Sequence, residues 1–424
     1  MDKKGLVIGI DYTDRFCQAA YYSERHKRAE SVGTGTDEIR YLIPTVMCYD
    51  PDIKDFIIGS RAYAAAQGKN LPLYKEFLKN VRERSRAFID GRDWDHTELL
   101  SVFFGKLIEY IRLRTSVMRI ESITVTVKQV TKELKAVIEE ALMLAGIEKA
   151  KIRLMSYGES FACFLIHEEE SLWKKGAMLF DFDEDGFTGM TLRISDQPER
   201  PLIFVDEYDC SAEFSVRDLA SEVTGERLDE KLSMLYERSC CTVKGMGVYF
   251  TGEGFSEPWF KKTLRKISAE RRAFRGNNIY VKGACIAGYD RSFKEYKEPA
   301  MICRGRVKNS ISVMAADKGE KKEILLSPAA VDWYEAFGCR DFILENEHSI
   351  VILIRSVISG ESTEIVFDLT GIEQRPVKAS RIRISVIYIN ERECEITVTD
   401  MGFGEFFPSS DIRITKRLDL EGQI

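Results

Sequence analysis

The chain has 424 residues, which is enough for two or more domains with separate cores. Its composition, 44% hydrophobic and 31% charged, is that of an ordinary globular protein, and a formal net charge of −6 gives no general attraction to nucleic acid or anionic lipid. No apolar run approaches the roughly 20 residues of a membrane span, and the apolar stretch before Asp11 is too short for a signal peptide. We therefore expect a cytoplasmic protein without a membrane partner.

The first part of the chain alternates between strand-like and helix-like segments. Two apolar runs around a turn at residues 12–15 predict a β-hairpin near the start, and residues 122–127 (SITVTV) predict a strand. Residues 131–147 (TKELKAVIEEALMLAGI) predict a helix that Thr131 caps and Gly146 ends. Further along, a basic helix is predicted over residues 260–275. The alternation predicts a layered α/β domain.

The pattern of the sequence changes after Tyr289. A polar, charged stretch is followed by short alternating segments bounded by turns, which predict an all-β module. The clearest of them are residues 349–357, 363–369, 380–389 and 394–400. The boundary is expected near residues 290–299, and we assign the first domain to 1–295 and the second to 296–424.

An acid-rich turn lies inside the segment AMLFDFDEDGFTGMTLRI, residues 177–194. D-x-D-x-D-G from Asp181 through Asp183 and Asp185 matches the start of a calcium loop, but Leu192 stands at the twelfth position in place of glutamate, and the flanks predict strands. A solvated acidic β-turn is the alternative. Zinc is not expected, because none of the ten cysteines forms a C-x-x-C pair.

Five segments, in order, resemble the seventy-kilodalton heat-shock chaperones, whose ATPase domain shares the actin fold. They look like that family's first phosphate loop, its connecting strand and helices, its second phosphate loop, its adenosine loop and its peptide-binding β-sandwich. The segments are GIDYTD (9–14), residues 123–165, FDFDEDGFTGMTL (180–192), VYFTGEGFSEPWFKKTL (248–264) and residues 366–405.

The resemblance implies a fold and a set of site residues. The fold is an actin-like (ribonuclease H-like) two-lobed α/β domain followed by an all-β sandwich. We expect this chain to depart from the family by a shortened second lobe and by the absence of the helical lid. The implied catalytic residues are Asp11, Asp181 and Glu159, the last lying one residue beyond the family's catalytic glutamate in an ungapped match. The residues implied to contact nucleotide are Thr13, Lys79, Gly252 and Gly254.

Both phosphate loops depart from the family pattern. Phosphate loops use glycine because their backbone N–H groups must face the anion without obstruction. Here Thr13, Asp14 and Arg15 replace Gly-Thr-Thr in the first loop, and residues 183–185 (DED) replace three glycines in the second. Two unit charges about 4 Å apart repel by roughly 4 kcal/mol at an effective dielectric of about 20. We therefore expect triphosphate to be excluded and ATP hydrolysis to be lost.

Three functional hypotheses follow. The leading one is a noncatalytic, chaperone-like scaffold without a cofactor, which binds a protein or an extended peptide through its C-terminal β-domain. The second is an unusual ATPase that binds ATP or ADP with magnesium, whose cations neutralise the acid turn. The third is an interaction module that binds calcium through Asp181, Asp183 and Asp185. Nucleic acid is not an expected partner, because the basic segment 260–275 has no aromatic stacking platform and a solvated face explains its charge.

Overall fold

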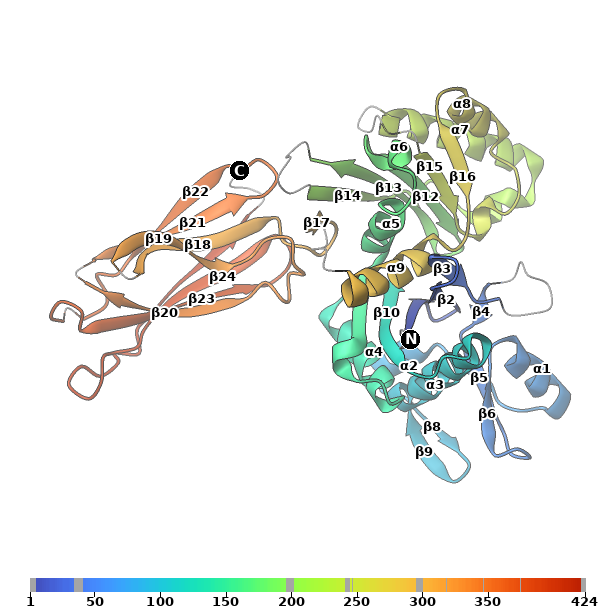
Figure 1. The fold of residues 1–424 in the computed structure, drawn as a ribbon, viewed down its shortest axis with the longest axis horizontal. Helices are drawn as coiled ribbons and strands as arrows, with labels where there is room; N and C mark the ends of the chain where they lie inside the picture. The colour runs from blue at the N-terminus through green and yellow to red at the C-terminus, as the bar shows by residue number, and fades with distance from the viewer. Residues whose placement is uncertain are drawn as a thin grey trace. The chain divides into compact units, whose positions relative to one another are not determined.

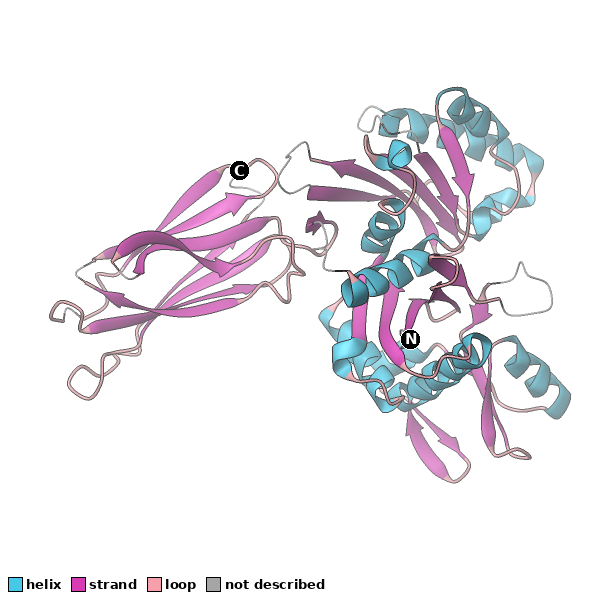
Figure 2. Ribbon diagram, in the orientation of Figure 1, coloured by secondary structure: helices cyan, strands magenta, loops and turns pink. Residues whose placement is uncertain are grey.

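The computed structural model describes residues 5–33, 41–195, 202–240, 245, 247–294, 300–317, 319–345, 347–373 and 375–420. The chain divides into two compact units, Met1–Pro299 and Ala300–Ile424 (Figure 1). Unit 1 is mixed α/β and unit 2 is rich in strands, as predicted at this coarse level (Figure 2). The predicted boundary between residues 295 and 296 lies outside the described residues. Of the helices described, none combines the length and apolarity needed to cross a membrane.

The first sheet of unit 1 begins with the predicted N-terminal hairpin. Its order is β11-β10-β1-β2-β3, with β4 paired to β2. Strands β1, β2 and β3 are antiparallel to their neighbours in this trio, whereas β10 runs parallel to β1 and β11 runs parallel to β10. The strands are β1 (Leu6–Tyr12), β2 (Phe16–Ser23), β3 (Arg28–Ser31), β4 (Ile43–Pro44), β10 (Ile120–Val127) and β11 (Ile152–Ser156).

The second sheet of unit 1 repeats this topology. Within unit 1 its strands run in the order β16-β15-β12-β13-β14. Strands β12, β13 and β14 form an antiparallel trio, and β15 and β16 continue the sheet in parallel beside β12. The acid turn joins β12 to β13, so the predicted hairpin at residues 177–194 is confirmed. The strands are β12 (Ala177–Asp183), β13 (Gly186–Ile194), β14 (Leu202–Asp209), β15 (Gly247–Thr251) and β16 (Arg272–Arg275).

The predicted basic helix over residues 260–275 is wrong at its C-terminal end. Helix α8 covers only Lys261–Glu270, and the chain then enters strand β16, which pairs parallel with β15. There the ring of Phe274 stacks on Tyr249 at a centroid distance of 4.9 Å. This tertiary contact and the strand pairing outweigh the helical tendency of the charged residues.

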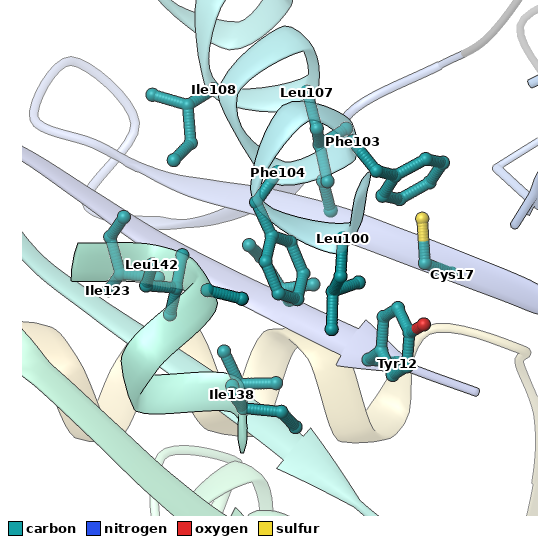
Figure 3. Close-up of a cluster of buried hydrophobic side chains, with 14 of the residues drawn as sticks. Tyr12, Cys17, Leu100, Phe103, Phe104, Leu107, Ile108, Ile123, Ile138 and Leu142 are labelled. Atoms are coloured by element: carbon teal, nitrogen blue, oxygen red, sulfur yellow. The ribbon is translucent and has the colours of Figure 1, made fainter. Parts of the chain in front are cut away.

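Helices cover both faces of the first sheet. On one face, α3 (His96–Thr115) and α4 (Lys132–Leu144) pack their apolar sides against β1 and β10 (Figure 3). As predicted, the side chain of Thr131 caps α4, and Gly146 has a positive φ of 86°. On the other face lies α9 (Ile279–Phe293), which approaches β1 so closely that a Cβ at Gly9 would stand 2.4 Å from the carbonyl oxygen of Val281.

A second helix, α5 (Tyr157–Leu165), crosses α9 at equally short range. A Cβ at Gly283 would stand 1.9 Å from the carbonyl oxygen of Ser160, so only glycine permits this crossing. In the second half of unit 1, α7 (Glu222–Cys240) and α8 share an aromatic core with the second sheet.

The remaining elements of unit 1 are short. They are β5 (Val46–Asp50), β6 (Asp55–Ile58), α1 (Ser60–Lys69), β7 (Tyr74–Lys75), α2 (Phe77–Arg82), β8 (Arg86–Ile89), β9 (Arg92–Asp95) and α6 (Glu170–Trp173), with 3-10 turns at Lys149–Lys151, Val216–Ala220 and Glu253–Phe255.

Unit 2 consists of two antiparallel sheets, ordered β19-β18-β21-β22 and β20-β23-β24-β25, around one shared core. The four strands predicted between residues 349 and 400 are confirmed. The elements are β17 (Ala300–Ile302), β18 (Asn309–Asp317), β19 (Glu320–Ser327), β20 (Gly338–Leu344), β21 (Ser349–Ser356), β22 (Ser362–Asp368), β23 (Ser380–Tyr388), β24 (Glu393–Asp400) and β25 (Arg413–Asp419).

Candidate functional site

A small cleft opens in unit 1 where the turns of the β1–β2 and β12–β13 hairpins face each other. Its volume is about 100 Å³, and its lining includes Asp11, Thr13, Arg15 and the three aspartates of the acid turn. Residues of the 251–253 loop and the tyrosines in the first turns of α5 and α9 also line it, as do Phe16, Cys17, Gln18, Leu42 and Asn277.

Asp11 and Asp181 occupy equivalent positions in the two repeated sheets. Asp11 lies near the end of β1 and pairs with Thr126 of the parallel strand β10. Asp181 lies near the end of β12 and pairs with Thr251 of the parallel strand β15. The duplicated topology therefore brings two carboxylates into one cleft from opposite sides.

Each of these aspartates accepts a hydrogen bond from a tyrosine in an equivalent place. Tyr157 begins α5, directly after the last strand of the first sheet, and its hydroxyl donates to Oδ1 of Asp11 at 2.7 Å. Tyr280 lies in the first turn of α9, after the last strand of the second sheet, and donates to Oδ2 of Asp181 at 2.8 Å. The two rings stack with centroids 3.9 Å apart and an interplanar angle of 10°. The stacking of the two tyrosine rings thus joins the two Tyr–Asp pairs.

The surroundings disfavour charge on both carboxylates. Burial raises the pKa of Asp11 from 3.8 to about 7; the hydrogen bond from Tyr157 lowers it, and the negative charge of Asp181 raises it further. Burial, followed by the charge of Asp183, raises the pKa of Asp181 to about 7, and the hydrogen bond from Tyr280 opposes the shift. Both carboxyl groups therefore change between the protonated and the charged form near neutral pH.

The acid turn directs part of its charge away from the cleft. Oδ1 of Asp183 accepts the backbone N–H of Asp185 at 2.8 Å, which closes the turn locally. Glu184 forms an ion pair with Arg15 at 2.7 Å, and this contact links the turns of the two hairpins. Because both side chains of the pair are largely exposed, we assign it little energy.

The first hairpin turn is organised by its own side chains. Oγ1 of Thr13 donates to the carbonyl oxygen of Phe16 at 2.8 Å and accepts the backbone N–H of the same residue at 3.1 Å. The carboxylate of Asp14 accepts the backbone N–H groups of Leu78 and Lys79, at 2.9 and 3.0 Å, in the first turn of α2. Asp14 therefore stabilises the start of a helix.

The structure brings six of the residues predicted for the site to the cleft: Asp11, Thr13, Asp181, Asp183, Asp185 and Gly252. Glu159 is absent from this lining, because it is the third residue of α5, only 3% exposed, and its Oε2 accepts the backbone N–H of Ser156 at 2.7 Å in a capping box. Lys79 is absent too, and its Nζ pairs with Glu76 at 2.9 Å.

The predicted glycines of the 251–255 loop have a packing role. Gly252 has a φ of +93°, and a Cβ there would meet the carbonyl oxygen of Phe182 at 2.3 Å and Oδ1 of Asp181 at 2.8 Å. A Cβ at Gly254, which does not line the cleft, would meet the ring of Phe182 at 2.4 Å. Both glycines let the loop close tightly on β12.

Within the described part of the chain, no group of three or more His, Cys, Asp or Glu side chains is arranged to hold a metal ion. The segment proposed for calcium, with Asp181, Asp183 and Asp185, forms a β-hairpin. Loops of the EF-hand type lie between helices.

The two tyrosines were missed by the sequence reasoning. Tyr157 stands two residues before Glu159, and Tyr280 lies in a segment to which no role was assigned. The sequence does carry a signal, since each tyrosine lies in the first turn of the helix that follows β11 or β16. Recognising it requires the duplication to be known first.

These observations define a duplicated α/β protein with an acidic, tyrosine-lined cleft, followed by a β-sandwich. The chain belongs to the family described as "Family of unknown function (DUF5716) C-terminal", whose model matches residues 28–304. A second model, "Domain of unknown function (DUF8552)", matches residues 306–420, within unit 2. No curated protein matches the chain. Asp11 precedes the residues that the family model matches, whereas Asp181 and both tyrosines lie within them.

Proposed function

We propose that unit 1 is an actin-like domain, of the type found in the ATPase part of seventy-kilodalton heat-shock chaperones, that has lost ATP hydrolysis and serves as a scaffold. Support comes from the repeated sheet topology and from the equivalent positions of Asp11 and Asp181 at the hairpin ends. The resemblance noted above also supports it, since it implies a phosphate loop at each of these hairpins.

The Tyr–Asp pairs carry the proposal that nucleotide is excluded. The stacked rings of Tyr157 and Tyr280 line the cleft and hydrogen-bond the two carboxylates, and the cleft volume of about 100 Å³ is well below the roughly 300–1,000 Å³ of typical ligand pockets. Any phosphate entering it would meet Asp183 and Asp185 beside Asp11 and Asp181. Arg15, a cation in this lining, is already paired with Glu184.

The positions of Glu159, implied for catalysis, and Lys79, implied for nucleotide contact, agree with this proposal. Glu159 caps a helix, and Lys79 pairs with Glu76 outside the cleft. A phosphoryl-transfer site also needs cations on the phosphates. Among the described residues of the lining, the cation Arg15 is paired with Glu184, whereas four aspartates face the cleft.

We propose further that unit 2 is the interaction module, which binds a protein or an extended peptide. A loop between β24 and β25 displays Phe403 and Phe406, which are 43% and 92% exposed. The loop is anchored by a buried bidentate ion pair, with Arg375 donating to Asp400 at 2.7 and 2.6 Å. The backbone N–H of Ser410 also donates to this carboxylate, at 2.8 Å. Exposed aromatic side chains on a firmly anchored loop are typical of a binding surface.

The proposal for unit 1 is tested by thermal unfolding of the full chain with ATP, ADP, magnesium and calcium, alone and combined. We expect no stabilisation, because a ligand that does not bind the folded state leaves its melting temperature unchanged. Opening the cleft with Tyr280→Ala, together with glycine at residues 183–185, should restore measurable nucleotide binding. ATP-dependent stabilisation of the wild type, with steady phosphate release that Asp11→Asn abolishes, would favour the ATPase hypothesis; stabilisation by calcium alone would favour the calcium module.

The proposal for unit 2 is tested by fluorescence anisotropy with a labelled library of unfolded peptides. We expect saturable binding that Phe403→Ser with Phe406→Ser weakens and that the control Val366→Ser, an exposed residue of β22, leaves unchanged. ATP and ADP with magnesium should have no effect. A tenfold change in affinity with either nucleotide, about 1.4 kcal/mol of coupling, would contradict the scaffold proposal.

A further inference from the structure

A larger cavity lies in unit 1 away from the acidic cleft. It has a volume of about 390 Å³, and strand β6, the start of α1 and one side of α3 form its walls. This volume lies within the range of roughly 300–1,000 Å³ that small-molecule sites occupy. None of its lining residues belongs to the cleft that contains Asp11 and Asp181.

The walls of this cavity are mainly apolar. Ile57, Ile58 and Leu107 form part of the inner surface, while Ile53 and Leu113 stand at the rim with 60% and 67% of their surfaces exposed. These two large aliphatic side chains are exposed to water, and covering them with an apolar ligand lowers the free energy of the complex. The size and the lining together favour an apolar ligand.

The charges of the lining balance. Lys106 of α3 is paired with Asp55 of β6 at 2.5 Å, and this contact lowers the pKa of the Asp55 carboxyl. The other two charged residues of the lining, Arg61 and Glu109, carry opposite signs. An ionic ligand would lose hydration against apolar walls without meeting a net counter-charge. An uncharged ligand avoids this cost.

We propose that this cavity is a binding site for an uncharged, mainly apolar small molecule, up to about the size of a two- or three-ring aromatic compound. The site is independent of nucleotide and of the function proposed above. A polar group at its edge, the hydroxyl of Ser60, can hydrogen-bond a single polar atom of the ligand.

The test uses two probes with the same ring skeleton, N-phenyl-1-naphthylamine, which is neutral, and 8-anilinonaphthalene-1-sulfonate, which is anionic. Titration of the full chain, followed by probe fluorescence, should give saturable 1:1 binding of the neutral probe and at least tenfold weaker binding of the sulfonate. Leu113→Asp and Ile53→Asp should each weaken the neutral probe at least tenfold. Leu144→Asp is the matched control, because Leu144 is a 57% exposed leucine outside the cavity lining.

The position of the bound probe is tested by energy transfer from tryptophan. The ring of Trp94 contacts that of Phe56, a lining residue, with centroids 5.4 Å apart. Trp94→Phe should therefore lower the tryptophan-sensitised probe emission more than the control Trp173→Phe, a residue of α6 outside the cavity lining, while the affinity measured by direct excitation stays the same.

Three results would overturn the inference: equal weakening by Leu144→Asp and Leu113→Asp, tighter binding of the sulfonate than of the neutral probe, or sensitised emission that does not depend on Trp94. Unchanged circular dichroism and melting temperature of the rim variants ensure that lost binding is not lost folding. Because Ile53 and Leu113 are exposed, we expect both variants to fold normally.

Discussion

Replacing Asp11 by asparagine should stabilise the protein at high pH and have little effect at low pH. The pKa of Asp11 is raised from 3.8 to about 7 in the folded state, so between these values the folded chain binds more protons than the unfolded chain. Stability contributed by this group is therefore present below about pH 4 and is lost as the pH rises toward 7. Asparagine still accepts the hydrogen bond from Tyr157 and has no charge to bury.

The size of the effect follows from the pKa. A rise from 3.8 to about 7 corresponds to an upper bound of about 4 kcal/mol, at 1.36 kcal/mol for each pH unit. Asp11 keeps some contact with water and titrates together with Asp181, so a smaller net gain of about 1–2 kcal/mol is expected at pH 8. At pH 4 the gain should be near zero, because both the carboxyl and the amide are then neutral in the fold.

The assay is scanning calorimetry of the full chain at several pH values between 4 and 8, comparing the wild type with Asp11→Asn. Asp90→Asn is the matched control, because Asp90 accepts a tyrosine hydrogen bond of the same 2.7 Å length, from Tyr49, at an exposed position. The control should show no gain that grows with pH. If Asp11→Asn destabilised the protein equally at pH 4 and pH 8, the assignment of Asp11 as a buried carboxyl whose charged form is disfavoured would be refuted.

Three further predictions concern packing. Arg375→Met leaves the fully buried carboxylate of Asp400 without its partner and should destabilise unit 2 by about 3–5 kcal/mol, whereas adding Asp400→Leu should recover part of the loss, both measured by calorimetry. Gly283→Ala places a Cβ against a carbonyl of α5 and should cost at least about 1–3 kcal/mol in urea unfolding, whereas Gly276→Ala, where the space is open, should cost far less. Phe406→Ser should change the melting temperature of unit 2 hardly at all, since surface substitutions usually stay within about 0.5 kcal/mol.

Local patterns in the sequence predicted much of the fold. The hairpins, the helix capped by Thr131 and the all-β character of unit 2 follow from alternation, turn residues and caps, which act within a few residues. Strand β16 could not be predicted in this way. Its residues, RAFR, gain strand structure from pairing with β15 and from the stack of Phe274 on Tyr249, which lies far away in the sequence.

The candidate site was predicted only in its local parts. Asp11 and Asp181 were identified because the short segments around them resemble the two phosphate loops of the chaperone family. Their partners could not be identified, since Tyr157 is 146 residues from Asp11 and Tyr280 is 99 residues from Asp181. The role of Asp14 was missed for a similar reason: it caps a helix that begins more than 60 residues later.

The position of α9 on the first sheet has a consequence for synthesis of the chain on the ribosome. The thiol of Cys285 in α9 donates to the carbonyl oxygen of Val7 in β1 at 3.8 Å, across 278 residues of sequence. At roughly 5–20 residues per second, the growing chain needs about 14 to 56 s to make that segment. Until then the face of β1 and β2 that carries Val7 and Ala20 has no helix to cover it. Nascent or truncated chains that end before residue 279 would therefore expose an apolar sheet face and be prone to aggregate.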